Sequence, residues 1–125
     1  MTARPCVLVV DDTESVRTLI GLNLEIEGYD VRFATDGQEA LDMVDAVHPD
    51  LITMDVMMPR LDGVAAATRL KNSPTTAAIP IVMVTAAAQE SDRRLGLAAG
   101  VDAYLTKPFE PAELVCTVRA LLPRR

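Results

Sequence analysis

The pattern of hydrophobic and polar residues along the chain alternates between two spacings. Short continuous apolar runs predict β-strands, whereas apolar residues three or four positions apart predict the buried faces of helices. The two patterns follow each other in turn along the whole sequence. They predict five strands, at residues 6–10, 29–34, 51–55, 79–85 and 103–106.

Helices are predicted between and after these strands. The segments 63–72 and 91–99 are Ala-rich and supply two of them. Each of the other three helices should bury one apolar face against the sheet. These faces consist of Val16, Leu19, Ile20 and Leu24 in the first helix, Ala40, Leu41 and Val44 in the second, and Leu114, Val115, Val118, Leu121 and Leu122 in the last.

Strands that alternate with helices indicate an α/β protein, in which right-handed crossovers make the strands parallel. Continuous runs such as "VLVV" and "IVMV" fit strands that are covered on both faces. We therefore predict one three-layer domain over residues 1–125, with a five-stranded parallel sheet between helices. Ligands of such sheets bind beyond the carboxyl ends of the strands, so functional residues are expected there.

Composition narrows the functional classes. The chain has 125 residues, 12 Lys+Arg and 18 Asp+Glu, for a formal net charge of −6. An acidic domain of this size argues against direct binding to nucleic acid or to an anionic membrane surface. No apolar run approaches the ~18 residues that span a bilayer, and the N-terminus lacks the apolar core of a secretory signal. We expect a cytoplasmic protein.

Cysteine and histidine offer no metal-binding pattern. Cys6 and Cys116 are far apart, and the sequence has no CxxC motif and no Cys/His cluster, which argues against a zinc site. We interpret both cysteines as small, reduced, buried residues. His48 precedes Pro49 in a predicted loop, so it is expected in solvent and not as a phosphoryl donor.

Polar residues stand where four of the predicted strands end. Asp11 and Asp12 follow the first strand, Asp55 closes the third, Thr85 closes the fourth, and Lys107 follows the fifth. The carboxyl ends of parallel strands meet at one edge of the sheet, so these groups should converge. Aspartate is also common in turns and at helix caps, and this alternative remains open for the Asp doublet.

Three carboxylates at one edge need a compensating cation. Oxygen ligands favour a hard ion, and Mg²⁺ suits a site that has few carboxylates and also accepts phosphate oxygens. Lys107 can pair with an acid and later with a phosphoryl group. The set fits phosphoryl transfer to a carboxylate, with Asp55 as the nucleophile and Asp11 and Asp12 as metal holders.

Five short motifs, taken in order, resemble the receiver domain of two-component response regulators over nearly the whole chain. The resemblance implies a flavodoxin-like fold with strand order 2-1-3-4-5, for which a chemotaxis protein of this family is a known example. It implies a signalling domain that takes a phosphoryl group from a sensor histidine kinase or phosphotransfer protein, and not an enzyme for external substrates. The motifs are "VLVVDD" with Arg17 downstream, "DGQEAL", "DVMMPRLDG" (55–63), "VTA" (84–86) and "GVDAYLTKPF" (100–109).

Carried over position by position, the resemblance implies a magnesium site, a phosphoacceptor and a switch. It also implies a cis peptide bond at the Lys-Pro pair. The matching positions are Asp55 for the phosphoacceptor, Asp11, Asp12 and the backbone carbonyl of Met57 for Mg²⁺, Lys107 for phosphate binding, and Thr85 and Tyr104 for the switch.

The expected switch follows from the chemistry of the modified carboxylate. A phosphate on Asp55 offers acceptor oxygens to Thr85, and movement of that hydroxyl frees space for Tyr104 to turn inward. The face formed by residues 91–99, the fifth strand and the last helix would then change shape. An ordinary half-buried aromatic with its hydroxyl in water remains the alternative for Tyr104.

Two positions depart from the DNA-binding members of the family that this chain resembles. Those members carry an acid before the switch aromatic and an arginine within the last helix, where this chain has Ala103 and Thr117. We therefore expect a monomer or a weak, phosphorylation-dependent dimer. We also expect a single-domain regulator that acts on an unidentified protein target, although a segment of a longer protein would read the same.

The remaining expectations concern turnover and competing classes. Neither Met57 nor Ala87 can orient an attacking water, so a long-lived phosphoaspartate is expected relative to an Ala87→Glu variant.

A phosphatase of the haloacid dehalogenase type would need an acid at position 57. A nucleotide-binding module would need a glycine-rich loop after the first strand, which is absent. A degenerate receiver would lack an acid, the threonine or the lysine, and all are present.

Overall fold

The computed structural model describes residues 4–56, 58, 60–86, 94 and 97–122. Five parallel strands form one sheet in the order β2-β1-β3-β4-β5, which confirms the predicted strand order and direction. The strands are β1 (Cys6–Val10), β2 (Asp30–Ala34), β3 (Leu51–Met54), β4 (Ile81–Thr85) and β5 (Ala103–Thr106).

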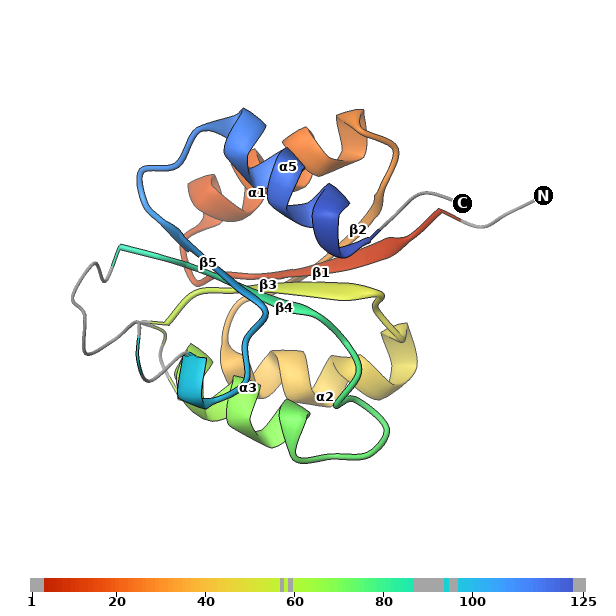
Figure 1. Cartoon of the computed structure of the whole chain (residues 1–125), viewed down its shortest axis with the longest axis vertical. Coiled ribbons are helices and arrows are strands. Elements are labelled where there is room, and N and C mark those ends of the chain that lie inside the picture. The colour runs from red at the N-terminus through yellow and green to blue at the C-terminus, as the bar shows by residue number, and fades with distance from the viewer. Residues whose placement is uncertain (1–3, 57, 59, 87–93, 95–96, 123–125) are drawn as a thin grey trace.

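Helices cover both faces of the sheet, as predicted. Figure 1 shows α1 and α5 on one face and α2 and α3 on the other. The predicted helix at 91–99 lies mostly outside the described residues, although Arg94, Leu97 and Ala98 have helical backbone. The helix bounds are α1 (Glu14–Ile26), α2 (Gly37–Val47), α3 (Gly63–Lys71) and α5 (Pro111–Leu121).

The central strands are buried on both sides, and the sheet divides the core into two clusters. Leu8 and Val10 of β1 point into the cluster under α2 and α3, whereas Val7 and Val9 point into the cluster under α1 and α5. All four side chains are at most 1% exposed. This burial explains the uninterrupted apolar run, because neither face of the strand meets water.

The buried face of α1 is rotated relative to the prediction. Ile20, Gly21 and Leu24 are buried, but Leu19 is 46% exposed, so its assignment to the core is wrong. A Cβ on Gly21 would lie 2.6 Å from the Phe33 ring. Glycine lets the helix approach β2 on that side, and the helix therefore turns Leu19 towards solvent.

The two cysteines are less buried than predicted. Cys6 is half-buried at the start of β1, and Cys116 is exposed on α5. The buried face of α5 contains Leu114 and Val118, one helical turn apart. Cys116 lies midway between them in sequence and therefore on the opposite side of the helix.

Candidate functional site

The three acidic residues meet at the edge where the strands end. Val10 of β1 pairs with Met54 of β3, so Asp11 and Asp55, the next residues along each chain, lie side by side. The Asp55 N–H donates to the Val10 carbonyl at 3.0 Å, which fixes this register. Carboxylate oxygens of Asp11, Asp12 and Asp55 lie within 4.8 Å of one another. The sequence predicted that Asp55 closes the third strand. In the structure β3 ends at Met54, and Asp55 is the first residue beyond it.

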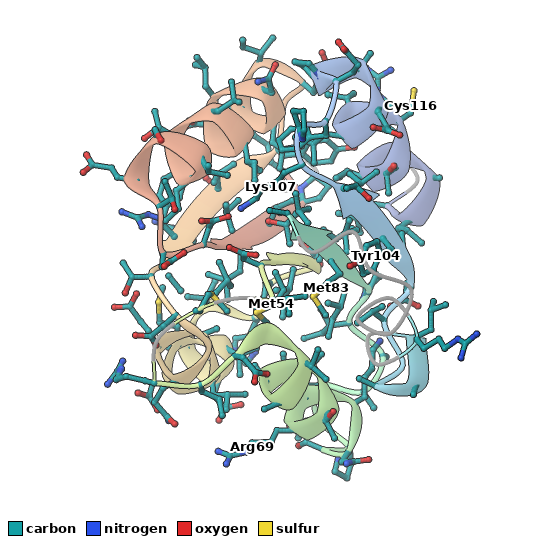
Figure 2. All side chains as sticks on the ribbon, turned by 90° about the vertical axis from the view of Figure 1, so that its left-hand side faces the viewer. Met54, Arg69, Met83, Tyr104, Lys107 and Cys116 are labelled. Carbon is teal, nitrogen blue, oxygen red and sulfur yellow. The ribbon has the colours of Figure 1, made fainter. Side chains whose placement is uncertain are left out.

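Lys107, the first residue after β5, bridges two of these acids. Its Nζ donates to Asp11 Oδ2 at 2.8 Å and to Asp55 Oδ2 at 3.2 Å. Figure 2 faces the edge where the strands end and shows Lys107 there. The Lys107-Pro108 peptide bond is cis, as the resemblance implied. The predicted convergence of strand-end residues is thus present for the three acids and the lysine.

The electrostatics of the site favour a charged lysine. Burial by itself lowers the pKa of Lys107, because desolvation disfavours the ammonium form. The hydrogen bond and charge of Asp11, together with the charge of Asp55, outweigh this effect, and the pKa of Lys107 lies above its ordinary value. The ammonium group is therefore retained at neutral pH as the partner of two buried carboxylates.

Asp11 takes part in a turn as well as in the acidic cluster. Its Oδ1 accepts a hydrogen bond from the Thr13 N–H at 2.9 Å, while Oδ2 faces Lys107. The Asp11 carbonyl accepts from Arg17 Nη1 at 2.8 Å. The turn that was an alternative explanation for Asp11 is therefore present, and it orients the carboxylate without competing with the site.

The residues present fit a divalent cation. Three carboxylates and one ammonium group leave a formal charge of −2, since −3 + 1 = −2. Asp11 and Asp55 are 1% and 6% exposed, so this charge is poorly compensated by water, whereas Asp12 is exposed. Oxygen ligands of this kind suit Mg²⁺. Met57, whose carbonyl the resemblance implied as a ligand, lies outside the described residues.

The start of α3 packs directly on the backbone of Asp55. Asp62 caps this helix by accepting from the Ala65 N–H at 2.8 Å. The Gly63 N–H donates to the Val56 carbonyl at 2.9 Å. A Cβ on Gly63 would lie 1.9 Å from the Asp55 carbonyl oxygen. Gly63 is therefore a site residue that the sequence analysis did not single out, although it closes the quoted motif "DVMMPRLDG".

The two expected switch residues lie on neighbouring strands. Thr85 ends β4 and pairs with Thr106, but its side chain is not described. Tyr104 pairs with Met83 and packs, half-buried, against the cluster under α2 and α3. Ala87 lies outside the described residues.

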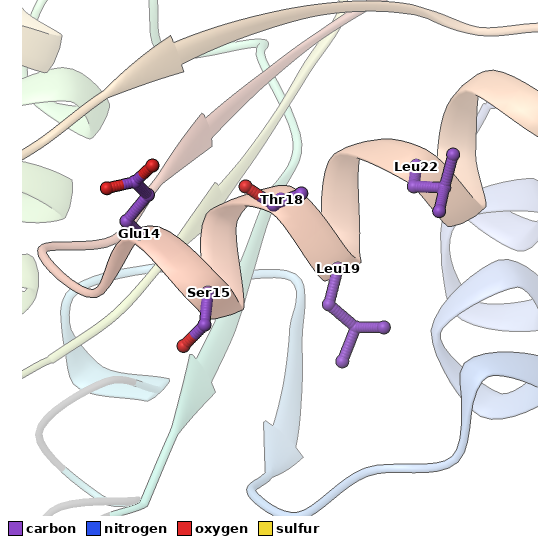
Figure 3. Close-up of a pocket in the computed structure, with 5 residues that line it drawn as sticks. All are labelled: Glu14, Ser15, Thr18, Leu19 and Leu22. Carbon is purple, nitrogen blue, oxygen red and sulfur yellow. The ribbon is translucent and has the colours of Figure 1, made fainter.

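The exposed side of α1 carries a hollow. Its lining begins at Glu14, the first residue of α1 and three positions after Asp11, and includes the apolar side chains of Leu19 and Leu22 (Figure 3). Leu22 is 54% exposed. The residues that line it are Glu14, Ser15, Thr18, Leu19 and Leu22.

Two further expectations can be compared with the structure. His48 is exposed at the C-terminal end of α2, as predicted, and is not part of the acidic edge. Among the described residues, the helices are all too short or too polar to cross a membrane.

The fold and the acidic edge together define an α/β domain with a cluster of carboxylates at the strand ends. The sequence profile of the response regulator receiver domain matches residues 7–119, and the chain belongs to this family. It is thus a receiver domain of a two-component system. Domains of this family work with histidine kinases or phosphotransfer proteins and bind Mg²⁺ at an acidic pocket.

Individual relatives agree with the family assignment. The chain is 48% identical over 118 residues to the alkaline phosphatase synthesis transcriptional regulatory protein PhoP of Bacillus subtilis, covering 94% of this chain and 48% of that protein. It is 42% identical over 120 residues to the DNA-binding dual master transcriptional regulator RpaA of Synechocystis, covering 96% and 50%. The chain spans about half the length of these curated relatives.

A solved structure supports the same fold. The chemotaxis protein CheY4 of Vibrio cholerae superposes with a TM-score of 0.90 at 33% identity, covering 96% of this chain and all of that one. The flavodoxin-like fold that the resemblance implied is therefore confirmed.

Proposed function

We propose that this receiver domain accepts a phosphoryl group on Asp55, with Mg²⁺ bound by Asp11, Asp12 and Asp55. The observation that carries the proposal is the Lys107 ammonium group, which holds Asp11 and Asp55 together at the strand ends. Two buried acids and a bridging lysine are costly to assemble for stability alone, because burial of charge carries a desolvation penalty.

The residues have separable roles in the transfer. An Asp55 carboxylate oxygen attacks the phosphorus of a phosphohistidine, the new O–P bond forms as the P–N bond breaks, and the histidine ring keeps the bonding electrons. A bound divalent ion neutralises charge on the phosphoryl oxygens. Lys107 already lies 3.2 Å from Asp55 and can follow the phosphoryl oxygens as they arrive. The backbone carbonyl of Met57 is proposed as a further ligand for the metal.

The donor is proposed to be a sensor histidine kinase or a histidine phosphotransfer protein. The chain's histidine, His48, is exposed at the far end of α2 and does not serve as the donor. The α1 hollow begins three residues after Asp11, and its exposed Leu19 and Leu22 offer an apolar surface on which such a partner can rest.

The output is proposed to follow from Thr85 and Tyr104. A phosphate on Asp55 gives the Thr85 hydroxyl a new acceptor, and Tyr104 turns inward as that hydroxyl moves. The changed surface would include β5 and α5 and would bind a downstream protein target. The formal charge of −6 supports output through protein contact, with the domain itself not touching nucleic acid and remaining a monomer or a weak dimer.

The test uses a small-molecule donor. Incubation with Mg²⁺ and acetyl phosphate should add the mass of one phosphoryl group to the wild type and nothing to Asp55→Asn. Chelation of Mg²⁺ should also abolish the addition. Phosphorylation of Asp55→Asn to the wild-type level would show that another residue is the acceptor and would overturn the proposal.

A further inference from the structure

Arg60 and Asp36 form an ion pair outside the acidic edge. Asp36 precedes α2 and is 6% exposed. Its Oδ2 accepts from Arg60 Nε at 2.9 Å and its Oδ1 accepts from Arg60 Nη2 at 3.0 Å. This two-point geometry fixes the orientation of the guanidinium group as well as its distance. Asp36 Oδ1 also accepts from the Glu39 N–H at 2.8 Å, so the first turn of α2 holds the carboxylate in place.

The backbone beside this ion pair is fastened to the same helix. Arg60 has φ 64°, a left-handed conformation that residues with a Cβ rarely adopt and that persists only when the surroundings impose it. The neighbouring Leu61 carbonyl accepts from the Gly37 N–H at 3.2 Å. A Cβ on Gly37 would lie 2.5 Å from that same oxygen. Side chain and backbone thus attach this point of the chain to the start of α2.

The attachment lies on the chain that leads away from Asp55. Arg60 is five residues after Asp55, and three residues later Gly63 packs on the Asp55 carbonyl and hydrogen bonds to Val56. Asp55 is therefore followed by two fixed points, the contact at Gly63 and the ion pair at Arg60. Loss of the ion pair leaves the Gly37–Leu61 backbone hydrogen bond to hold this stretch against α2 without the side-chain link beside it.

We infer that Arg60 is a positioning residue of the acidic edge: through its ion pair with Asp36 it holds the chain that follows Asp55 and so raises the affinity of Asp11, Asp12 and Asp55 for Mg²⁺. The inference rests on the proposed function, because it concerns the same metal site. Arg60 does not act by its charge on the metal, since a nearby cation repels Mg²⁺.

The direction in which each substitution changes the affinity for Mg²⁺ distinguishes positioning from simple electrostatics. If charge alone mattered, Arg60→Gln would bind Mg²⁺ more tightly and Asp36→Asn less tightly, because one removes a positive and the other a negative charge. If the ion pair positions the site, both substitutions weaken Mg²⁺ binding. The double variant should then be no weaker than the weaker single variant, because the same link is lost in each.

The experiment is a titration with MgCl₂, followed by backbone amide NMR shifts, of the wild type, Arg60→Gln, Asp36→Asn and the double variant. Each single variant should weaken binding by about fivefold or more, the lower end of coupling between linked sites. Arg60→Lys should fall between wild type and Arg60→Gln, because lysine keeps the charge but not the two-point geometry. Thermal unfolding of each variant checks that it is folded. Because the Arg60 side chain is exposed, Arg60→Gln and Arg60→Lys should disturb the fold less than Asp36→Asn.

Each outcome has a defined meaning. Weaker binding in both single variants, with no further loss in the double variant, supports positioning. Tighter binding in Arg60→Gln, or equal affinities across the set, overturns the inference even though the wild type binds Mg²⁺. Lack of any Mg²⁺ response in the wild type overturns the proposed function, and the inference falls with it.

Discussion

Replacement of Gly63 by alanine tests the contact between α3 and the backbone of Asp55. The new Cβ would lie 1.9 Å from the Asp55 carbonyl oxygen, and Cβ atoms essentially never come within 3.0 Å of such an atom. The two must therefore separate by about 1.1 Å, from 1.9 to 3.0 Å. The neighbouring atom is backbone and not the end of a flexible side chain, so the helix or the chain at Asp55 has to move.

The expected change in the free energy of unfolding follows from two costs and one gain. Overpacking of a tight contact costs about 1–3 kcal/mol. Stretching of the Gly63–Val56 hydrogen bond costs about 1 kcal/mol more. The higher helix propensity of alanine returns at most about 1 kcal/mol. We expect Gly63→Ala to lower the free energy of unfolding by about 2 kcal/mol, the middle of these estimates.

Urea unfolding followed by far-ultraviolet circular dichroism measures this difference. Ala65→Gly in the same helix serves as the matched control, because it reports the alanine-over-glycine preference of α3 without the clash. A Gly63→Ala variant as stable as the wild type, or more stable, would show that the contact with Asp55 is not tight and would refute the reasoning.

Three further outcomes follow from the structure. Lys107→Met leaves two buried carboxylates without their ammonium partner and should lower the free energy of unfolding by roughly 3 kcal/mol when a chelator is present. Urea unfolding measures this loss, and addition of MgCl₂ should restore part of the lost stability. A variant as stable as the wild type in chelator would contradict this prediction. The hydrogen bonds of Arg60 hold the pKa of Asp36 below its ordinary value, so the pair stabilises the fold at neutral pH, and that contribution is lost as the pH falls through the lowered pKa. Arg60→Gln should therefore be less stable than wild type at about pH 7, and this difference in stability should shrink as the pH falls through the lowered pKa of Asp36; a difference that stays unchanged in acid would exclude this cause. Leu24→Ala should cost about 2–5 kcal/mol and Leu19→Ala less than about 0.5 kcal/mol in the same unfolding assay, and similar losses would mean that α1 is not rotated.

The sequence predicted the fold and the acidic edge well because both depend on local patterns. A buried parallel strand needs a continuous apolar run, as Val7 to Val10 show, and the residue after it must emerge at the shared edge. The positions of Asp11, Asp55 and Lys107 follow from that rule, and the structure brings them within hydrogen-bond distance. The roles of these residues in phosphoryl transfer stay predictions.

Contacts between distant segments were not predictable from the sequence. Leu19 has the spacing of a core residue, but the approach of Phe33 to Gly21 decides which way α1 faces. The ion pair of Asp36 and Arg60 joins positions 24 residues apart, and no periodic pattern records it. Both residues stand in the quoted motifs. The sequence therefore names them, but it does not show that they are each other's partners.

The unequal environments of the two thiols make the natural chain suitable for site-specific labelling. Burial, and then the charge of Asp30, raises the pKa of Cys6, so little of the reactive thiolate forms there at neutral pH. Cys116 is exposed on α5 and open to reagents. A maleimide dye or nitroxide should therefore attach at Cys116 without prior mutagenesis, and it would place a spectroscopic reporter on one of the elements that the proposed switch remodels.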